Sequence, residues 1–321
     1  MRTIQTGQTF PLSSVKPLER VSSLRELCLA ATRRLLEKGG LPRAASPITG
    51  KPLRLQGEVG GLPYGLCVET DSLFLMRLAR PEEWERLLEE TGRFRHAPAG
   101  LKGDLSQSRA DHVYAPKLDW IQETLTLQGI RKARILEAVT PPSQMSALLN
   151  ESRSFAEIRT IGEMALAHEG GTREQGSAEA VVMLESLDRV DDPRGLLRGA
   201  SNRLTEGGLL FVTALVASGF DLEVLGLRSR YLYPPDRTNC FSLRGLRQLL
   251  ENEGFRMLEV STPGVLDVQI VQAHLQADPA LELSRFERQI AESDPETGAE
   301  FQSFLQRRAL SSFARLVARK R

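Results

Sequence analysis

Several carboxylates in this 321-residue sequence stand at the ends of short apolar runs. Glu137 lies in "RILEAV", Glu163 follows "EIRTIG", and Glu185 and Asp188 lie in "MLESLDRVDD". If these runs are parallel strands, their carboxyl ends meet at the edge where open α/β sheets bind ligands. The carboxylates could then accept hydrogen bonds from a ligand there. The alternative is that each is a solvated turn residue or the start of the next helix.

Thiols and imidazoles give no comparable pattern. Cys28, Cys67 and Cys240 are far apart in sequence, which suits reduced, packed thiols better than a disulfide framework. His112 and His168 lie in polar stretches without a paired acid at motif spacing, so we expect both at the surface.

The composition is that of a globular protein. Lys and Arg number 42 against 41 for Asp and Glu, so the charge balance gives no reason to expect nucleic acid or an anionic membrane as partner. No stretch has the apolar length of a signal peptide or a membrane span. We therefore expect a cytoplasmic protein.

The elements that must position these residues begin at residue 134. The apolar runs "RILEAV", "EIRTIG", "EAVVMLE" and "GGLLFVTAL" alternate with helical patterns such as "PRGLLRGASNRL". This rhythm predicts an α/β domain with a doubly wound, mostly parallel, Rossmann-like sheet. After it we expect a helix over 243–253, then closing strands from 255 to 260 and in "LDVQIVQAHL".

The segments before and after this domain have different patterns. Amphipathic spacing predicts helices over 22–40 and from Pro81 to Gly92, and 41–80 reads as a small β-rich module. Residues 95–111 read as a loop, and "KLDWIQETLTLQ" as a helix. The tail, 280–321, reads as two helices interrupted at Pro295 and Gly298. Its basic end could bind phosphate, but we expect a solvated last helix turn; the residues are Arg315, Arg319, Lys320 and Arg321.

The stretch "AEAVVMLESLDRVDDPRGLLRGASNRLTEGGLLFVTAL" resembles the fourth strand, helix and fifth strand of class I S-adenosylmethionine-dependent methyltransferases. "YPPDRTNCFSLRGLRQLLENEGF" is similar to a later segment of that family, and "STPGVLDVQIV" to the branch that carries an amino-terminal zinc-binding module. The resemblance implies three parts. They are an amino-terminal helical and zinc-ribbon-like module in degenerate form (1–115), a methyltransferase-like α/β domain (116–278) and a carboxy-terminal helical extension (279–321).

The family's cofactor contacts are altered at several positions. Its glycine-rich first turn, which lets backbone approach the cofactor, is replaced here by residues 138–142, including Pro141 and Pro142. The resemblance gives Glu137 the place of the family's acidic residue and Glu163 that of the ribose acceptor. It also implies that one strand-helix unit between residue 134 and "AEAVVM" is missing. Asp236 stands where the family has a histidine base, and a carboxylate pKa is usually too low for that role.

The zinc ligands of the family's module are also replaced. "SPITGKPL" puts Ser46 and Thr49 where two thiolates would stand, and "GLCVETDSLF" keeps Cys67 but has Thr70 in place of its partner. Neutral hydroxyls are poor zinc ligands, so we expect no metal.

Two interpretations follow. In the first, the protein has lost S-adenosylmethionine binding and acts as a non-catalytic scaffold, pairing with a protein partner that is an active relative or a second copy of itself. In the second, it is a divergent S-adenosylmethionine-dependent methyltransferase acting on a sugar, a sugar nucleotide or a cell-surface glycan. Glu137, Glu163 and Glu185 would then bind the cofactor, and Asp236 would be the catalytic base.

Overall fold

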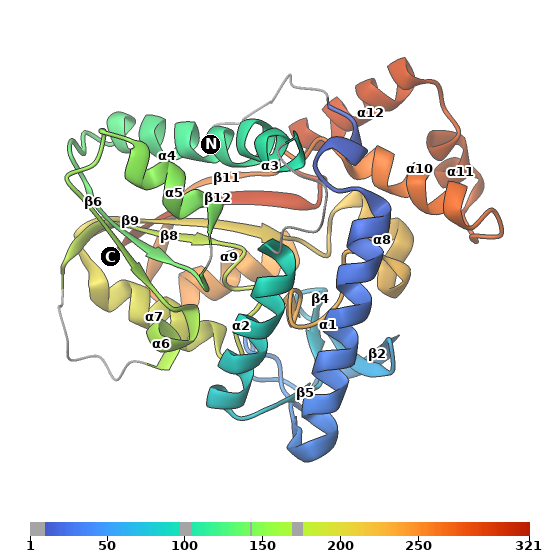
Figure 1. Ribbon diagram of the computed structural model, residues 1–321, viewed down its shortest axis with the longest axis horizontal. Coiled ribbons are helices and arrows are strands. Elements are labelled where there is room, and N and C mark those ends of the chain that lie inside the picture. Colours follow the sequence, from blue (N-terminus) through green and yellow to red (C-terminus); the bar gives the residue numbers. More distant parts are fainter. Residues whose placement is uncertain (1–9, 97–103, 142, 169–175) are drawn as a thin grey trace.

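The computed structural model describes residues 10–96, 104–141, 143–168 and 176–321. Its centre is a six-stranded sheet in the order β11-β12-β9-β8-β6-β7 (Figure 1). The neighbours β7, β6, β8 and β9 pair in parallel, and β12 pairs antiparallel with both β9 and β11. The predicted α/β, mostly parallel fold is therefore confirmed.

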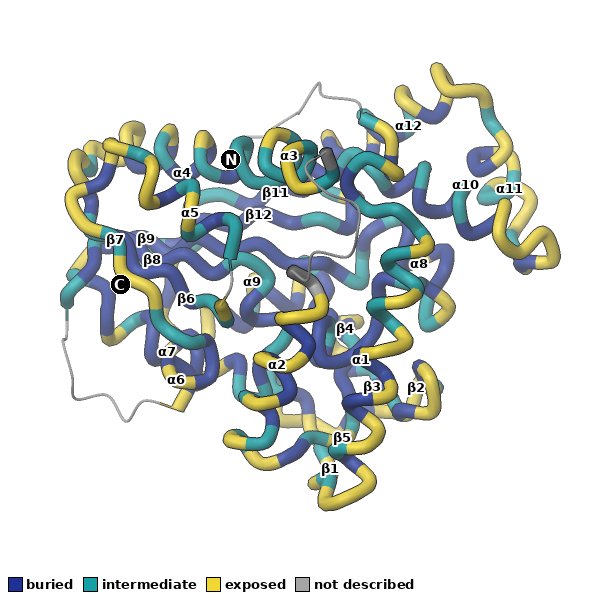
Figure 2. The backbone as a smooth tube through the Cα atoms, in the orientation of Figure 1, coloured by how far each residue is buried: buried dark blue, intermediate teal, exposed yellow. Residues whose placement is uncertain are grey.

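The strands of this sheet are β6 (Arg134–Ala138), β7 (Glu157–Ile161), β8 (Ala178–Leu184), β9 (Leu204–Leu215), β11 (Phe255–Ser261) and β12 (Phe313–Lys320). Helices cover both faces. On one face, α4 (Ala115–Leu127) and α5 (Gln144–Glu151) pack their apolar side chains against the sheet. On the other face lie α6 (Glu163–His168), α7 (Pro193–Arg203) and α9 (Leu243–Asn252). The central strands β6, β8 and β9 are largely buried in Figure 2, which explains their apolar runs, whereas the edge strand β7 is mostly exposed.

The β-rich segment forms a second, antiparallel sheet in the order β10-β4-β3-β2. Its strands are β2 (Arg54–Val59), β3 (Leu62–Cys67), β4 (Ser72–Leu75) and β10 (Asn239–Cys240), beside a short pair formed by β1 (Leu41–Pro42) and β5 (Arg77–Leu78). Because β10 comes from the α/β part of the chain, the small sheet and the large domain are joined by backbone hydrogen bonding. The helices α1 (Leu18–Gly39) and α2 (Pro81–His96) pack together beside it.

The remaining helical segments are η1 (Leu12–Ser14), α3 (Asp104–Arg109), the π-helical turn η2 (Ala110–Tyr114), α8 (Phe220–Leu225), η3 (Gly226–Arg228), α10 (Asp267–Ala277), α11 (Arg285–Ala291) and α12 (Pro295–Arg307). The last three project from one end of the molecule in Figure 1. No helix among the described residues combines the length and apolar character needed to cross a membrane.

Three secondary-structure expectations were wrong. "LDVQIVQAHL" forms helix α10, because its apolar residues Val268, Val271 and Leu275 also fit helical spacing and pack as one face. The end of the tail is strand β12 rather than a helix, and it is hydrogen-bonded on both sides. Within the expected loop 95–111, the described part is largely helical; residues 97–103 lie outside the described residues.

The resemblance implied that one strand-helix unit is missing between residue 134 and "AEAVVM", a stretch that includes the interval between β7 and β8. There the described residues contain only α6, and β7 lies at the edge of the sheet. The residues from 169 to 175 are outside the described part of the chain.

Candidate functional site

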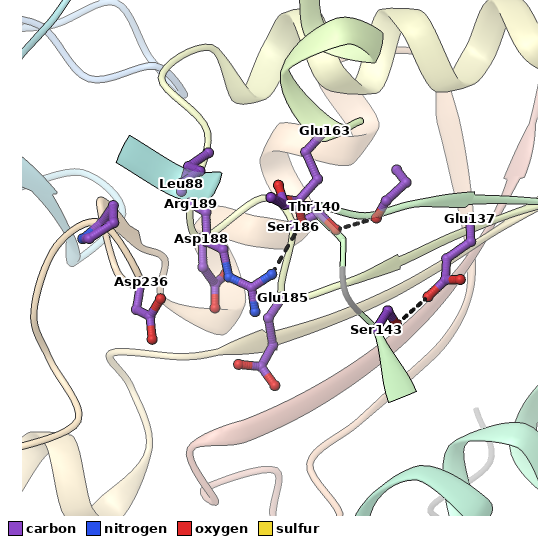
Figure 3. A network of polar contacts seen from close by, with 12 residues as sticks. Leu88, Glu137, Thr140, Ser143, Glu163, Glu185, Ser186, Asp188, Arg189 and Asp236 are labelled. Carbon is purple, nitrogen blue, oxygen red and sulfur yellow. Dashed lines mark hydrogen bonds and ion pairs between the residues drawn. The ribbon is translucent and has the colours of Figure 1, made fainter. Parts of the chain in front are cut away.

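The carboxyl edge of the parallel strands brings together the carboxylates singled out in the sequence (Figure 3). Glu137 lies near the end of β6, Glu163 begins α6, and Glu185 follows β8. Glu137, Glu185 and Asp236 line a cavity of about 500 Å³, whereas Glu163 is not among its lining residues. Three of the four candidate residues named from the sequence therefore line one cavity.

Glu137 is buried, and its carboxylate is already occupied by hydroxyl donors. The Ser143 hydroxyl donates to it at 3.2 Å and the Ser146 hydroxyl at 2.5 Å. Burial raises the pKa of Glu137, and the two serine hydrogen bonds oppose that rise. Ser143 also caps α5 by accepting from the Ser146 amide. The side chains at the start of α5 thus contact the Glu137 carboxylate directly.

The turn after β6 continues the strand for one residue before α5 begins. The Val139 amide donates to the carbonyl of Ile161 at 2.9 Å, so this donor serves the sheet. Pro141 has no amide proton to offer. The other proline of this turn, Pro142, lies outside the described residues.

Glu163 is not a solvated turn residue. Only 1% of it is exposed, its Oε1 lies 3.2 Å from Nη1 of Arg189, and its Oε2 accepts a hydrogen bond from Thr140 at 2.8 Å. Figure 3 marks this ion pair with Arg189 by a dashed line. Of the alternatives left open by the sequence, Glu163 begins the next helix but is not solvated, because Arg189 from the β8–α7 loop supplies a buried counter-charge.

Glu185 has the left-handed backbone conformation, with φ of 62°. A non-glycine residue held there is strained, and such strain is often found at ligand sites. Its carboxylate lies 2.6 Å from Nη2 of Arg237 and 3.8 Å from Nζ of Lys117. Burial alone would raise the pKa of Glu185, but Arg237 and Lys117 outweigh it and hold the pKa well below its usual value.

Asp188 and Asp236 differ in their access to the cavity. Asp188 is fully buried behind it and accepts a hydrogen bond from the Leu215 amide at 3.0 Å. Burial raises the pKa of Asp188 to about 8. Asp236 lines the cavity and accepts a hydrogen bond from the Tyr233 hydroxyl at 3.0 Å. It is buried as well.

The two histidines differ from each other. His168 is partly exposed and lies 3.1 Å from the Asp191 carboxylate, so it does have an acidic partner. His112 lines the cavity and stacks on Phe10 with ring centroids 4.7 Å apart, which corrects its expected surface position.

The sequence did not group the basic side chains of the cavity, and of these only Arg315 was singled out. Seven of the lining residues are Lys or Arg and four are Asp or Glu. Among the cations, Lys16 precedes α1, Lys117 lies on α4 and Arg315 on β12. They are too far apart in sequence for any spacing pattern to have grouped them.

A second cluster surrounds the Cys67 thiol in the small module. Thr49 Oγ1 lies 3.7 Å from Cys67 Sγ, and Ser46 and Thr70 also contact the thiol. Burial would raise the pKa of Cys67, but hydrogen bonds from Ser46, Thr70 and Thr49 outweigh it, and the pKa lies below its usual value. The four residues that the sequence placed at ligand positions thus converge. Among the described residues, no group of three or more His, Cys, Asp or Glu side chains could hold a metal ion.

The relationship to other proteins rests on this same α/β region. Residues 130–260 match a family model described as a methyltransferase domain. The central domain has a methyltransferase-like fold. No curated protein matches the chain in sequence.

Solved structures with a similar methyltransferase-like domain share little sequence with the chain. A putative sarcosine dimethylglycine methyltransferase from Galdieria sulphuraria is 15% identical, over 70% of this chain and 90% of that one, with a TM-score of 0.39. A 1,6-didemethyltoxoflavin-N1-methyltransferase from Burkholderia thailandensis, solved with S-adenosylhomocysteine, is 12% identical over 78% and 95%, with a TM-score of 0.41. A Haloferax volcanii complex of the Trm112 methyltransferase activator and a putative methyltransferase gives 11% identity over 74% and 97%, with a TM-score of 0.41.

Proposed function

We propose that this methyltransferase-like protein has given up its family's S-adenosylmethionine site and acts by binding rather than by methyl transfer. The observation that carries the proposal is that each candidate cofactor carboxylate is already engaged by the protein. Glu137 accepts from two serines, Glu163 is paired with Arg189, and Glu185 is paired with Arg237. A ribose or amino group would have to displace these partners and leave buried polar atoms unpaired, which is costly.

The turn after β6 supports the same proposal. A glycine-rich turn offers free amides and no side chains to a cofactor. Here the Val139 amide is used by the sheet, and Val139 and Thr140 both carry side chains into the cavity wall.

Calorimetric titration with S-adenosylmethionine and S-adenosylhomocysteine tests the proposal. We expect affinity no better than millimolar, about −4 kcal/mol of binding free energy. A Ser146→Ala variant, which frees one oxygen of Glu137, should not recover micromolar binding, because the turn is unchanged. Micromolar affinity of the native chain would contradict the proposal.

The partner we propose is a protein, either an active methyltransferase relative or a second copy of this chain. Exposed apolar side chains at the α11–α12 end support a contact surface: Phe286 is 58% exposed, and Phe304 and Leu310 are also exposed. Large exposed apolar groups gathered in one region are a feature of interaction sites. Light scattering over a range of concentrations, with Phe286→Ser as the comparison, tests self-association. If the protein remains monomeric at all concentrations, self-association is excluded and the proposed partner is a different protein.

A second candidate function is favoured by the cavity itself, because open α/β sheets bind ligands at this edge. In this alternative, the chain is a divergent methyltransferase for a sugar, a sugar nucleotide or a cell-surface glycan, and Asp236 accepts the substrate proton. Transfer of labelled methyl from S-adenosylmethionine to such an acceptor, abolished by Asp236→Asn, would favour this alternative over the first proposal.

A further inference from the structure

Four basic side chains share one region of the cavity: Lys16, Arg109, Lys117 and Arg315. Arg109 and Lys117 both lie over the ring of Tyr114, and Lys117 shares the ring of Phe313 with Arg315. Burial lowers the pKa of Lys117, as do the charges of the other three cations. Lys117 is only 3% exposed. Like charges gathered in a buried space repel one another and lose hydration, so the arrangement is unfavourable unless an anion compensates it.

Arg315 is poorly hydrogen-bonded, although the charges of Glu259 and Asp119 attract it. It is 6% exposed, and among the described residues its buried Nε has no hydrogen-bond partner. Its guanidinium contacts aromatic faces instead, with 5.4 Å to the ring centroid of Trp120 and 5.9 Å to that of Phe313. A ring face offers a cation much less than a carboxylate does.

Glu185, the acidic cavity residue that faces Lys117, does not neutralise this cluster. Glu185 attracts both Lys16 and Lys117, but its carboxylate is hydrogen-bonded to Arg237 at 2.6 Å and lies 3.8 Å from Lys117. One carboxylate is therefore shared among several cations. Glu259 and Asp119 attract Arg315 but do not line the cavity, and along the lining itself basic residues outnumber acidic ones.

The walls beside the cluster are aromatic. Lys117 Nζ lies 5.4 Å from the ring centroid of Tyr114 and 5.1 Å from that of Phe313, and Lys16 Nζ lies 4.9 Å from that of Tyr231. The stacked rings of Phe10 and His112 line the same cavity. A ligand here would meet cations at one place and flat apolar surface around it.

We propose that this cavity binds a small organic anion, a carboxylate or phosphate ester on an aromatic or apolar body, with its oxyanion between Lys117 and Arg315. The planar guanidinium of Arg315 matches the geometry of carboxylate and phosphate oxygens. The proposal does not depend on whether the family's cofactor binds, because S-adenosylmethionine is not the ligand it names.

Calorimetry with matched probes tests the ligand class. We expect saturable binding of phenyl phosphate or benzoate, at least about tenfold tighter than that of the neutral benzyl alcohol or of inorganic phosphate. Comparing phenyl phosphate with benzoate decides between the two oxyanions. If benzyl alcohol binds as tightly as the organic anions, the site does not require a negative charge. If inorganic phosphate binds as tightly, the site does not require an aromatic or apolar body. No saturable binding of either organic anion in the low millimolar range overturns the proposal as a whole.

Two variants test the place of binding. Arg315→Gln and Lys117→Gln should each weaken the tighter organic anion by about tenfold or more. Arg319→Gln is the matched control: it lies on the same strand, bonds Gln128 at 2.6 Å, and is not a cavity residue. Thermal melts accompany the titrations and establish that each variant is folded. Equal binding by all three folded variants overturns the site.

Discussion

Arg189 and Glu163 form a nearly buried ion pair, 3.2 Å between Nη1 and Oε1, that joins the loop after β8 to the start of α6. Thr140 from the β6 turn donates to the other oxygen of the same carboxylate. The Glu163 side chain therefore links three segments at the carboxyl edge of the sheet: the turn after β6, the start of α6 and the loop after β8.

Glu163→Ala should be strongly destabilising, by about 3–5 kcal/mol, because it leaves Arg189 buried without its counter-charge. Denaturant unfolding measures the change in the free energy of unfolding. Glu157→Ala is the control, since its ion pair with Arg159 is largely solvent-exposed and should contribute about 0–1 kcal/mol. If Glu163→Ala lowers the free energy of unfolding no more than Glu157→Ala does, the ion pair is not buried in solution.

Phe211→Ala should cost about 3–5 kcal/mol through lost burial and the cavity it leaves. Phe211 is fully buried in β9 and meets Trp120 edge-on, with ring centroids 5.3 Å apart. The same measurement on Phe286→Ala, at an exposed position, should show a change within about 0.5 kcal/mol. Comparable losses in the two variants would refute a central position for β9.

The hydroxyl cluster around Cys67 predicts a gain of function by substitution. The purified native chain should contain less than one equivalent of zinc, because three of the four converging groups are hydroxyls. The triple variant Ser46→Cys, Thr49→Cys, Thr70→Cys should bind one zinc ion. The 3.7 Å between Thr49 Oγ1 and Cys67 Sγ is close to the sulfur–sulfur spacing of about 3.8 Å around tetrahedral zinc.

Elemental analysis after dialysis checks this prediction, with Thr49→Cys alone as the control that lacks a complete ligand set. A triple variant with no more zinc than the control would mean that the four side chains do not converge.

Stability should fall as pH rises from about 4 toward 8. Asp221 is fully buried beside Asp267, and burial together with the charge of Asp267 raises the pKa of Asp221 to about 8. Because the folded pKa lies above the unfolded one, the folded state binds the extra proton, and that stabilisation is lost as pH rises through the folded value. Unfolding curves across this range should be flatter for Asp221→Asn. An unchanged slope in the variant would assign the pH dependence to other groups.

Periodicity predicted most elements of the α/β domain because its strands are continuous apolar runs between capped helices. It failed for α10 and β12, where a short run fits either period and only the neighbours decide. In β12, Arg315 and Arg319 are four residues apart, as on one helix face, yet the strand is inserted between β9 and β11. Tertiary pairing determined the outcome.

The candidate site was predicted in part for a similar reason. Strand ends locate Glu137 and Glu185 because parallel strands place them at a common edge. The partners of Glu163 and Glu185 could not be foreseen, since Arg189, Arg237 and Lys117 approach from a loop, another loop and a helix on separate parts of the chain. The sequence indicates where carboxylates lie, but their charge environment depends on long-range contacts.

The position of β12 has a consequence for synthesis on the ribosome. Strand β12 comprises residues 313–320, yet it lies between β9 and β11, which are complete by residue 261. Until residue 320 has emerged, β9 and β11 each present an unpaired edge, and an open edge is a template for pairing with other chains. The edges of β9 and β11 therefore remain unpaired while more than fifty residues, from 262 to 320, are translated. Its solubility in that interval depends on whatever shields those edges, not on the stability of the finished fold.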